Sequence, residues 1–157
     1  MRPYPEEIQR AVQMVMMSHF APELTSAYSQ RELGIVMLLF SIIQRDYDTA
    51  VPDLIEQNAR LRKLLGDASQ ALAALDRDDA RAGRETIAAL PGATDSLRLS
   101  ALRAEHDALR GALSALAPLI EPAADDPSLA PLREVRAKVF AHLAADAKRR
   151  SVPVLGG

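Results

Sequence analysis

The chain has 157 residues, a hydrophobic content of 48%, a net charge of −2 and no cysteine. This length suffices for one domain with a hydrophobic core, and the apolar content excludes a disordered chain. The charge balance excludes a nucleic-acid surface, which needs concentrated lysine and arginine, and the absence of cysteine excludes disulfides and thiolate metal sites.

A first helix is predicted to begin at Pro5, a residue suited to the first helical position. Glu6 and Glu7 follow it and favour the positive N-terminus of a helix. Pro22 is expected to end or sharply bend this helix, because proline has no amide donor. Its apolar side is formed by four residues at helical spacing: Ile8, Val12, Val15 and His19.

The most apolar run in the sequence is Leu33–Ile43, which has no polar face. A helix that is apolar on all sides is normally buried on all sides, so we predict a central core helix over about residues 30–45. Ser29 and Glu32 have capping-box spacing and favour a start at Ser29 over one at Pro22. The run is shorter than the ~20 residues that span a bilayer, so no membrane partner is expected.

Pro52 disfavours helical geometry at the preceding residue and lacks an amide donor, so a break is predicted there, with a kinked continuous helix as the alternative. Beyond it, apolar positions recur in steps of three and four residues through three heptads. This spacing is typical of helices that pack at a shallow angle. The seam consists of Leu54, Asn58, Leu61, Leu65, Ala68, Leu72 and Leu75.

The second half of the chain predicts three more helices. A short one runs from about Asp78 to Leu90, and a longer one follows with Asp95 as its expected cap. The longer helix carries a second seam in the same steps: Leu99, Leu102, His106, Leu109, Leu113, Leu116 and Ile120. The last helix is expected to be capped by Asp126 and to end near Arg150. Its apolar stripe is Leu132, Val135, Val139 and His142.

Together these elements predict an all-α protein, an antiparallel bundle of four to five main helices around the central apolar helix at about residues 30–45. One domain is expected over residues 1–150, followed by a flexible tail over residues 151–157. Either seam can pack within the chain or against a second subunit, and we expect a cytoplasmic homodimer.

No motif of a known active site occurs in the sequence. It lacks the glycine-rich phosphate loops, the HExxH zinc motif and the G-x-S-x-G nucleophile turn. The residues three positions before the histidines are Met16, Arg103 and Val139, so the Glu-x-x-His pairs of di-iron bundles are missing too. We therefore expect no catalytic residue, no cofactor and no metal, and a protein that is not an enzyme.

His19, His106 and His142 fall on the apolar stripes of three different predicted helices, and Asn58 lies on a fourth. These four residues are the candidates for buried polar or pocket positions. Three converging imidazoles suit a metal such as zinc, whereas the alternative is that backbone groups or water satisfy each one separately.

Asn58 and His106 allow a further interpretation. A single polar residue in an apolar seam can fix register and oligomeric state at some cost in stability. On this interpretation, Asn58→Leu is expected to stabilise the protein and to blur its oligomeric state.

Four methionines, Met14, Met16, Met17 and Met37, lie in the first third of the chain. Methionine suits adaptable apolar pockets, although at helical spacing it equally suits an ordinary core. The alternative function is therefore a protein that binds or converts a lipophilic or acyl compound in a pocket between helices, lined by histidine and methionine.

Residues Glu56–Leu65 carry the pattern Glu-x-Asn-x-x-Leu-Arg-x-Leu-Leu. The surrounding segment, from Asp48, resembles a family of uncharacterised bacterial all-helical proteins. Genes of that family tend to lie near acyl-CoA dehydrogenases and near small-molecule kinases of the aminoglycoside phosphotransferase type. The resemblance carries no catalytic residue and implies an accessory protein, acting through self-association or a protein partner.

Overall fold

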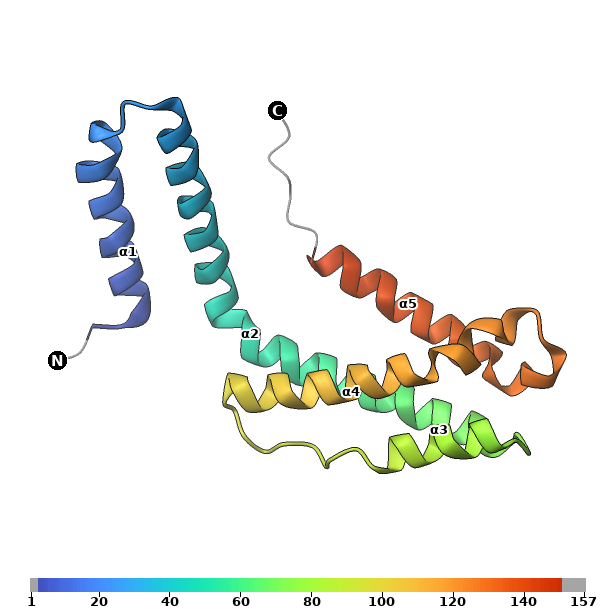
Figure 1. Ribbon diagram of the computed structural model, residues 1–157. Coiled ribbons are helices and arrows are strands. Elements are labelled where there is room, and N and C mark those ends of the chain that lie inside the picture. Colours follow the sequence, from blue (N-terminus) through green and yellow to red (C-terminus); the bar gives the residue numbers. More distant parts are fainter. Residues whose placement is uncertain (1–2, 151–157) are drawn as a thin grey trace. The chain divides into compact units, whose positions relative to one another are not determined.

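A computed structural model describes residues 3–150 and shows helices joined by loops and short helical turns (Figure 1). No strand occurs in this range, so the predicted all-α class is confirmed. The predicted tail over residues 151–157 lies outside the described residues. The α-helices are α1 (Pro5–Val15), α2 (Ala27–Ala73), α3 (Asp78–Ala88), α4 (Leu99–Ile120) and α5 (Arg133–Arg150).

The contacts divide the chain into two compact units, Met1–Pro52 and Asp53–Gly157, where the sequence suggests one domain over residues 1–150. Helix α2 is nevertheless continuous through Pro52, so the predicted break is wrong and the continuous helix is correct. Proline removes one helical hydrogen bond and costs about 3 kcal/mol. The helix-forming residues on both sides evidently outweigh this cost.

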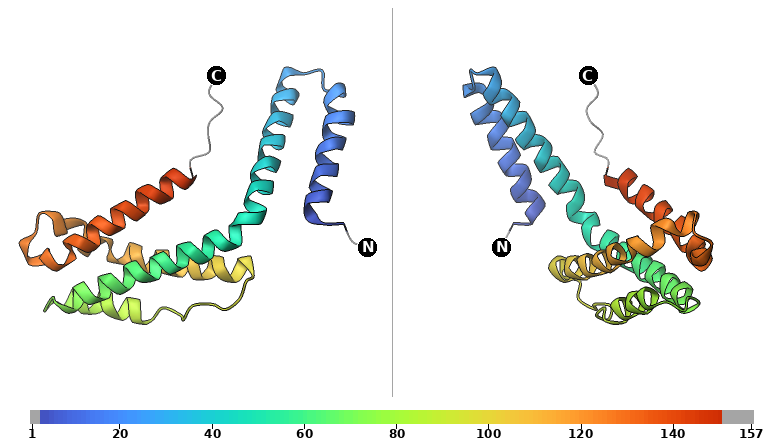
Figure 2. Two further views of the ribbon diagram at one scale, coloured as in Figure 1. Left: turned by 180° about the vertical axis from the view of Figure 1, so that it is seen from behind. Right: turned by 45° about the vertical axis from the view of Figure 1, so that its right-hand side comes forward.

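The first unit is a helical hairpin. Helix α1 and the part of α2 before Pro52 run side by side in opposite directions (Figures 1 and 2). After α1 the chain continues as a π-helical turn, Met16–Phe20, and a 3-10 turn, Ala21–Glu23. Helix α2 then begins at Ala27, between the two predicted starts, because Ser26 Oγ accepts a hydrogen bond from the backbone amide of Ser29 at 3.4 Å.

The predicted burial of the central apolar helix is wrong. Residues 33–43 are helical, but none of them is buried, and Ile35, Leu39 and Ile43 are 46%, 53% and 58% exposed. A helix without a polar face needs neighbours on every side, and within its own unit this segment has only the one helix, α1. Its partly buried positions are Leu33, Val36, Met37, Phe40 and Ile42.

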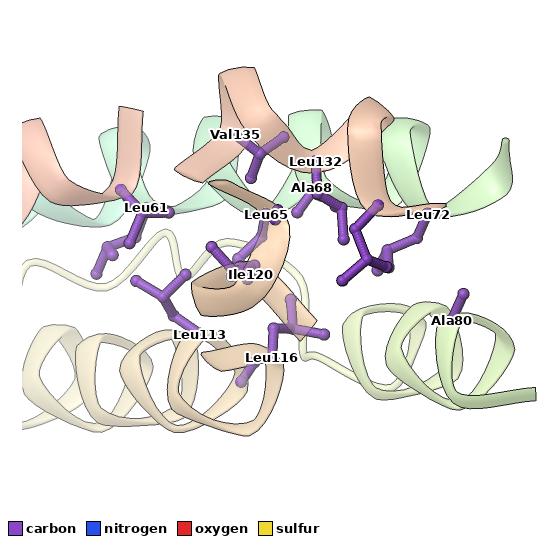
Figure 3. Packing of buried hydrophobic residues seen from close by; sticks show 14 of the residues in the cluster. Leu61, Leu65, Ala68, Leu72, Ala80, Leu113, Leu116, Ile120, Leu132 and Val135 are labelled. Carbon is purple, nitrogen blue, oxygen red and sulfur yellow. The ribbon is translucent and has the colours of Figure 1, made fainter. Parts of the chain in front are cut away.

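The hydrophobic core lies in the second unit, where both predicted seams meet (Figure 3). Helix α2 contributes Leu61, Leu65, Ala68 and Leu72, and α4 contributes Leu109, Leu113, Leu116 and Ile120. Helix α5 and the 3-10 helix before it, Pro127–Leu132, add Leu132, Val135 and Val139. The two seams therefore pack within one chain, which decides between the alternatives left open by the sequence.

Helix α3 approaches this core closely at Gly83. A Cβ atom added there would lie 2.9 Å from Leu116 Cδ2 and 3.2 Å from Leu72 Cδ1. Both leucines are about 1% exposed, so neither side chain has room to move away freely. The missing side chain thus allows α3 to pack against α2 and α4.

The ends of the later elements differ from the prediction by a few residues. Helix α4 begins at Leu99, and its N-cap residue is Arg98 rather than the predicted Asp95. Asp126 does act as a cap, accepting hydrogen bonds from Ser128, although the element it caps is the 3-10 helix that precedes α5.

Candidate functional site

Asn58 of α2 and His106 of α4 form a buried polar pair and are 3% and 8% exposed. Asn58 Nδ2 donates to the carbonyl oxygen of Leu102 at 3.0 Å, and Asn58 Oδ1 lies 2.9 Å from His106 Nδ1. A carbonyl only accepts, so the amide nitrogen must face Leu102 and Oδ1 must face the ring. His106 Nδ1 therefore carries a proton and donates it to Asn58 Oδ1.

These hydrogen bonds join the α2 seam to the α4 seam at one position along the two helices. Asn58 occupies a position of the α2 seam, and both of its partners belong to the α4 seam. A shift of either helix by one turn would leave these buried polar groups among leucines, at a cost of about 1–3 kcal/mol for each unsatisfied group. The pair thus selects the register of α2 against α4.

A second buried polar group, Glu105, is not indicated by the sequence. Its carboxylate is 7% exposed and accepts hydrogen bonds from Arg62 Nε at 2.8 Å and from the Thr94 amide at 3.1 Å. Arg62 also donates to the Pro91 carbonyl oxygen at 2.9 Å, so these bonds hold the loop between α3 and α4 against α2. Glu105 precedes a seam position, where a carboxylate is usually solvated, and no pattern marks it as buried.

A pocket of about 170 Å³ lies beside the Asn58–His106 pair, between α2, α4 and α5. Its apolar walls include Leu61, Leu113, Ile120 and Val139, and its polar lining includes His106, Arg110 and His142. The structure therefore brings two of the candidate histidines to one cavity.

His142 is half-buried in the wall of this pocket. Burial lowers the pKa of its imidazole, because removal from water disfavours the charged ring. Asp146, one turn further along α5, acts against this shift in pKa, whereas nearby guanidinium groups, among them that of Arg110, add to it. His142 is therefore mainly neutral near pH 7.

The other candidates lie elsewhere. His19 is exposed in the hairpin, and Met14, Met16, Met17 and Met37 all belong to the hairpin as well. No methionine lines the pocket, so the predicted lining by both histidine and methionine is wrong for its methionine part. Among the side chains that the structure describes, no three histidine or acidic groups gather in a way that would hold a metal ion.

Comparisons with protein-family models, with curated proteins and with solved structures find no match for this chain. The resemblance at Glu56–Leu65 therefore stays an expectation. None of the helices described between residues 3 and 150 has the length and apolar character needed to cross a membrane.

Proposed function

We propose that this chain is a non-enzymatic association protein that acts as a homodimer, with the α1/α2 hairpin as its dimer surface. The observation that supports this proposal is the exposure of the hairpin's apolar side chains. Thirteen of the seventeen exposed large hydrophobic residues in the described part of the chain lie within residues 3–52. Exposed apolar surface on this scale marks an interaction site.

The exposed residues follow stripes that the hairpin does not use internally. In α1 the stripe Ile8, Val12 and Val15 is 50%, 38% and 45% exposed. The neighbouring residue Gln9 instead hydrogen-bonds through Nε2 to the carbonyl oxygen of Phe40 in α2. In α2 the exposed stripe consists of Ile35, Leu38, Leu39 and Ile43.

Charge supports a second copy as the occupant of this surface. No charged residue occurs between Arg10 and Glu23, or between Glu32 and Arg45. The two stripes therefore offer no ionic pattern by which a partner of opposite charge would be selected, whereas apolar stripes complement themselves about a two-fold axis. Two hairpins supply four helices, the number that encloses a common core in the simplest bundles.

Two features of the sequence agree with this role. The resemblance at Glu56–Leu65 implies an accessory protein that acts by association. The absence of cysteine fits a reducing compartment such as the cytoplasm, and we place the homodimer there.

Sedimentation equilibrium between about 1 and 100 μM tests the proposal, with the dimer expected to dominate at the upper end. Leu39→Glu places a charge in the exposed stripe of α2 and is expected to give a monomer with unchanged helical circular dichroism. Leu97→Glu is the matched control, because Leu97 is 70% exposed but lies in the loop before α4. This variant should remain a dimer.

A wild-type monomer at 100 μM contradicts the proposal, as does equal behaviour of the two variants. If the monomer instead forms a stoichiometric complex with a different protein, and Leu39→Glu abolishes that complex, the hairpin serves a heterologous partner and self-association is refuted.

A further inference from the structure

We propose that the pocket between α2, α4 and α5 binds a small uncharged alcohol whose apolar body is about the size of one benzene ring. The site lies in the second unit and contains no residue of the hairpin, so it is independent of the proposed dimer surface. Three features support the proposal: the volume of the pocket, the mixed charge of its lining and the ring of His142 in its wall.

The volume of the pocket sets the size of the ligand's apolar body. An apolar protein cavity of about 150 Å³ admits a benzene molecule. The pocket has about 170 Å³, and Leu61, Leu113, Ala117, Ile120 and Val139 form much of its wall. Phe140 and Leu143 of α5 also line it and are each 47% exposed, so we place the entrance from solvent beside them. A single ring or a chain of about six carbons therefore fits.

The charged side chains in the lining have both signs. Arg110 contributes one guanidinium group, and Glu121 and Asp146 contribute two carboxylates. An anionic ligand therefore meets the carboxylates, and a cationic ligand meets the guanidinium. Either ion would also lose hydration on entering a largely apolar cavity, which is costly for a charged group. An uncharged ligand avoids both costs, so the lining favours a neutral molecule.

His142 supplies the polar contact for the ligand. Its ring is half-buried in the pocket wall, and no hydrogen bond to another described residue occupies its nitrogens. Burial lowers the pKa of this imidazole, so near pH 7 the ring is mainly neutral, with one N–H donor and one acceptor nitrogen. A hydroxyl group both donates and accepts, and it can therefore pair with either tautomer. His106 lines the same pocket, but its Nδ1 already donates to Asn58 Oδ1.

The test is a titration of the full chain at pH 7 with three ligands that share one ring and differ in charge: benzyl alcohol, sodium benzoate and benzylamine. Binding is followed by ¹H–¹⁵N NMR of the backbone and of the histidine rings. For benzyl alcohol we expect saturable shifts around the pocket, with a dissociation constant of about 1 mM or tighter. Benzoate and benzylamine should bind at least about tenfold more weakly, because their charged groups lose hydration.

His142→Phe tests the contact with the hydroxyl group, because it keeps a flat ring and removes both nitrogens. This variant should bind benzyl alcohol about five- to tenfold more weakly, since the hydroxyl loses its partner. Toluene has the same ring and no hydroxyl, so its affinity for the variant should stay within about twofold of the wild-type value, which also shows that the variant is folded. His19→Phe is the matched control, because His19 is exposed in the hairpin and lies outside the pocket. Both affinities should be unchanged in it.

A second pair of variants tests the cavity. Ala117→Leu fills part of the pocket and should abolish the binding of benzyl alcohol, and Ser114→Leu serves the same purpose if that variant does not fold. Ala104→Leu is the matched control, since Ala104 is exposed on the same helix and does not line the pocket. Its affinity should equal that of the wild type.

A third pair tests the absence of an ionic contact. Arg110→Gln removes a charge from the lining, and Arg103→Gln removes one from an exposed position of α4 outside the pocket. Each should change the affinity for benzyl alcohol by less than about twofold, because no charge-assisted hydrogen bond is lost. All titrations are repeated in the Leu39→Glu background, so that a failure of this site is distinguishable from a failure of the proposed dimer.

Several results would overturn the proposal. The absence of saturable shifts up to about 20 mM benzyl alcohol, well above the expected dissociation constant, would refute the site. Benzoate or benzylamine binding as tightly as benzyl alcohol would refute the uncharged class of ligand. If His142→Phe weakens benzyl alcohol no more than toluene, or if Arg110→Gln weakens benzyl alcohol well beyond Arg103→Gln, then His142 is not the partner of the hydroxyl group.

Discussion

The two units of this protein use apolar helices in opposite ways. In residues 53–150, three helices each carry a narrow apolar stripe, and the stripes meet in one core with leucines that are about 1% exposed. In residues 3–52, two helices pack against each other, and many of their large apolar side chains remain exposed. A stripe specifies the side on which a partner must lie, whereas a helix that is apolar all round specifies none. Apolar content alone therefore does not locate the core.

Truncation of one leucine in each unit tests this contrast and should give the largest effect. Leu65→Ala empties a site in the packed core and is expected to lower the free energy of unfolding by about 3 kcal/mol. Leu39→Ala, at a position that is 53% exposed, should lower it by less than about 1 kcal/mol. Urea unfolding at about 1 μM protein, where a weak dimer dissociates, measures both. Equal losses in the two variants would show that the hairpin is as tightly packed as the core.

The Asn58–His106 pair provides the next test, and the structure reverses the expectation from the sequence. Asn58→Leu removes the donor to the Leu102 carbonyl and the acceptor of His106 Nδ1, so we expect a loss of about 1–3 kcal/mol rather than a gain. Adding His106→Leu should recover part of this loss, because two apolar side chains then face each other. A double-mutant cycle measures the coupling. A stabilised Asn58→Leu variant would instead show that the polar side chain of Asn58 lowers the stability of the seam, as the sequence suggests.

These residues also show what the sequence could predict and where it stopped. The seams of α2 and α4 were readable because a three–four repeat places every member on one face, whatever the partner is. The pairing of Asn58 with His106 was not readable, since 48 residues separate them and the repeat does not fix which turn of one helix meets which turn of the other. Burial of Glu105 depends on Arg62 and on a loop amide, both distant in sequence.

The pocket was only half predicted, for a related reason. His106 and His142 were candidates because they lie on apolar stripes, and both line the cavity. Its volume depends on the side chains that happen to meet there from three helices, which no single stripe encodes. His19 satisfied the same periodicity but lies in the unit that forms no core, where a stripe residue stays exposed.

Two glycines sharpen the comparison between packed and open helix surfaces. At Gly66, on the exposed side of α2, a Cβ atom would meet nothing within 4 Å, so Gly66→Ala should stabilise the protein by up to about 1 kcal/mol. At Gly83 the same change drives a methyl group into Leu116 and Leu72, and we expect a net loss of about 1 kcal/mol. Thermal unfolding of the two variants measures this difference in sign. A stabilised Gly83→Ala variant would show that Leu116 and Leu72 can move to make room for the methyl group.

The smallest effect should come from the ion pair that joins α5 to α2 on the surface of the second unit. Lys138 Nζ lies 2.8 Å from Asp67 Oδ2 and 2.8 Å from Glu134 Oε1. The hydrogen bond from Lys138 lowers the pKa of Asp67 below its ordinary value of 3.8. A carboxyl group whose pKa is lower in the folded state stabilises the protein above its unfolded pKa. That contribution is lost as the pH falls through the folded pKa.

Lys138→Met should therefore lower the melting temperature at pH 7 by about 2 °C or less, because exposed ion pairs contribute little and are screened by salt. At a pH low enough to protonate Asp67 in the folded state as well, the difference from the wild type should disappear. Asp67→Asn should show the same convergence, since it removes the other partner, whereas Arg103→Gln should leave the pH dependence unchanged. A difference that persists after Asp67 is protonated would mean that the methylene groups of Lys138, and not its charge, contribute at this position. In that case apolar contacts stabilise the second unit even at this surface contact between α5 and α2, and the ion pair does not.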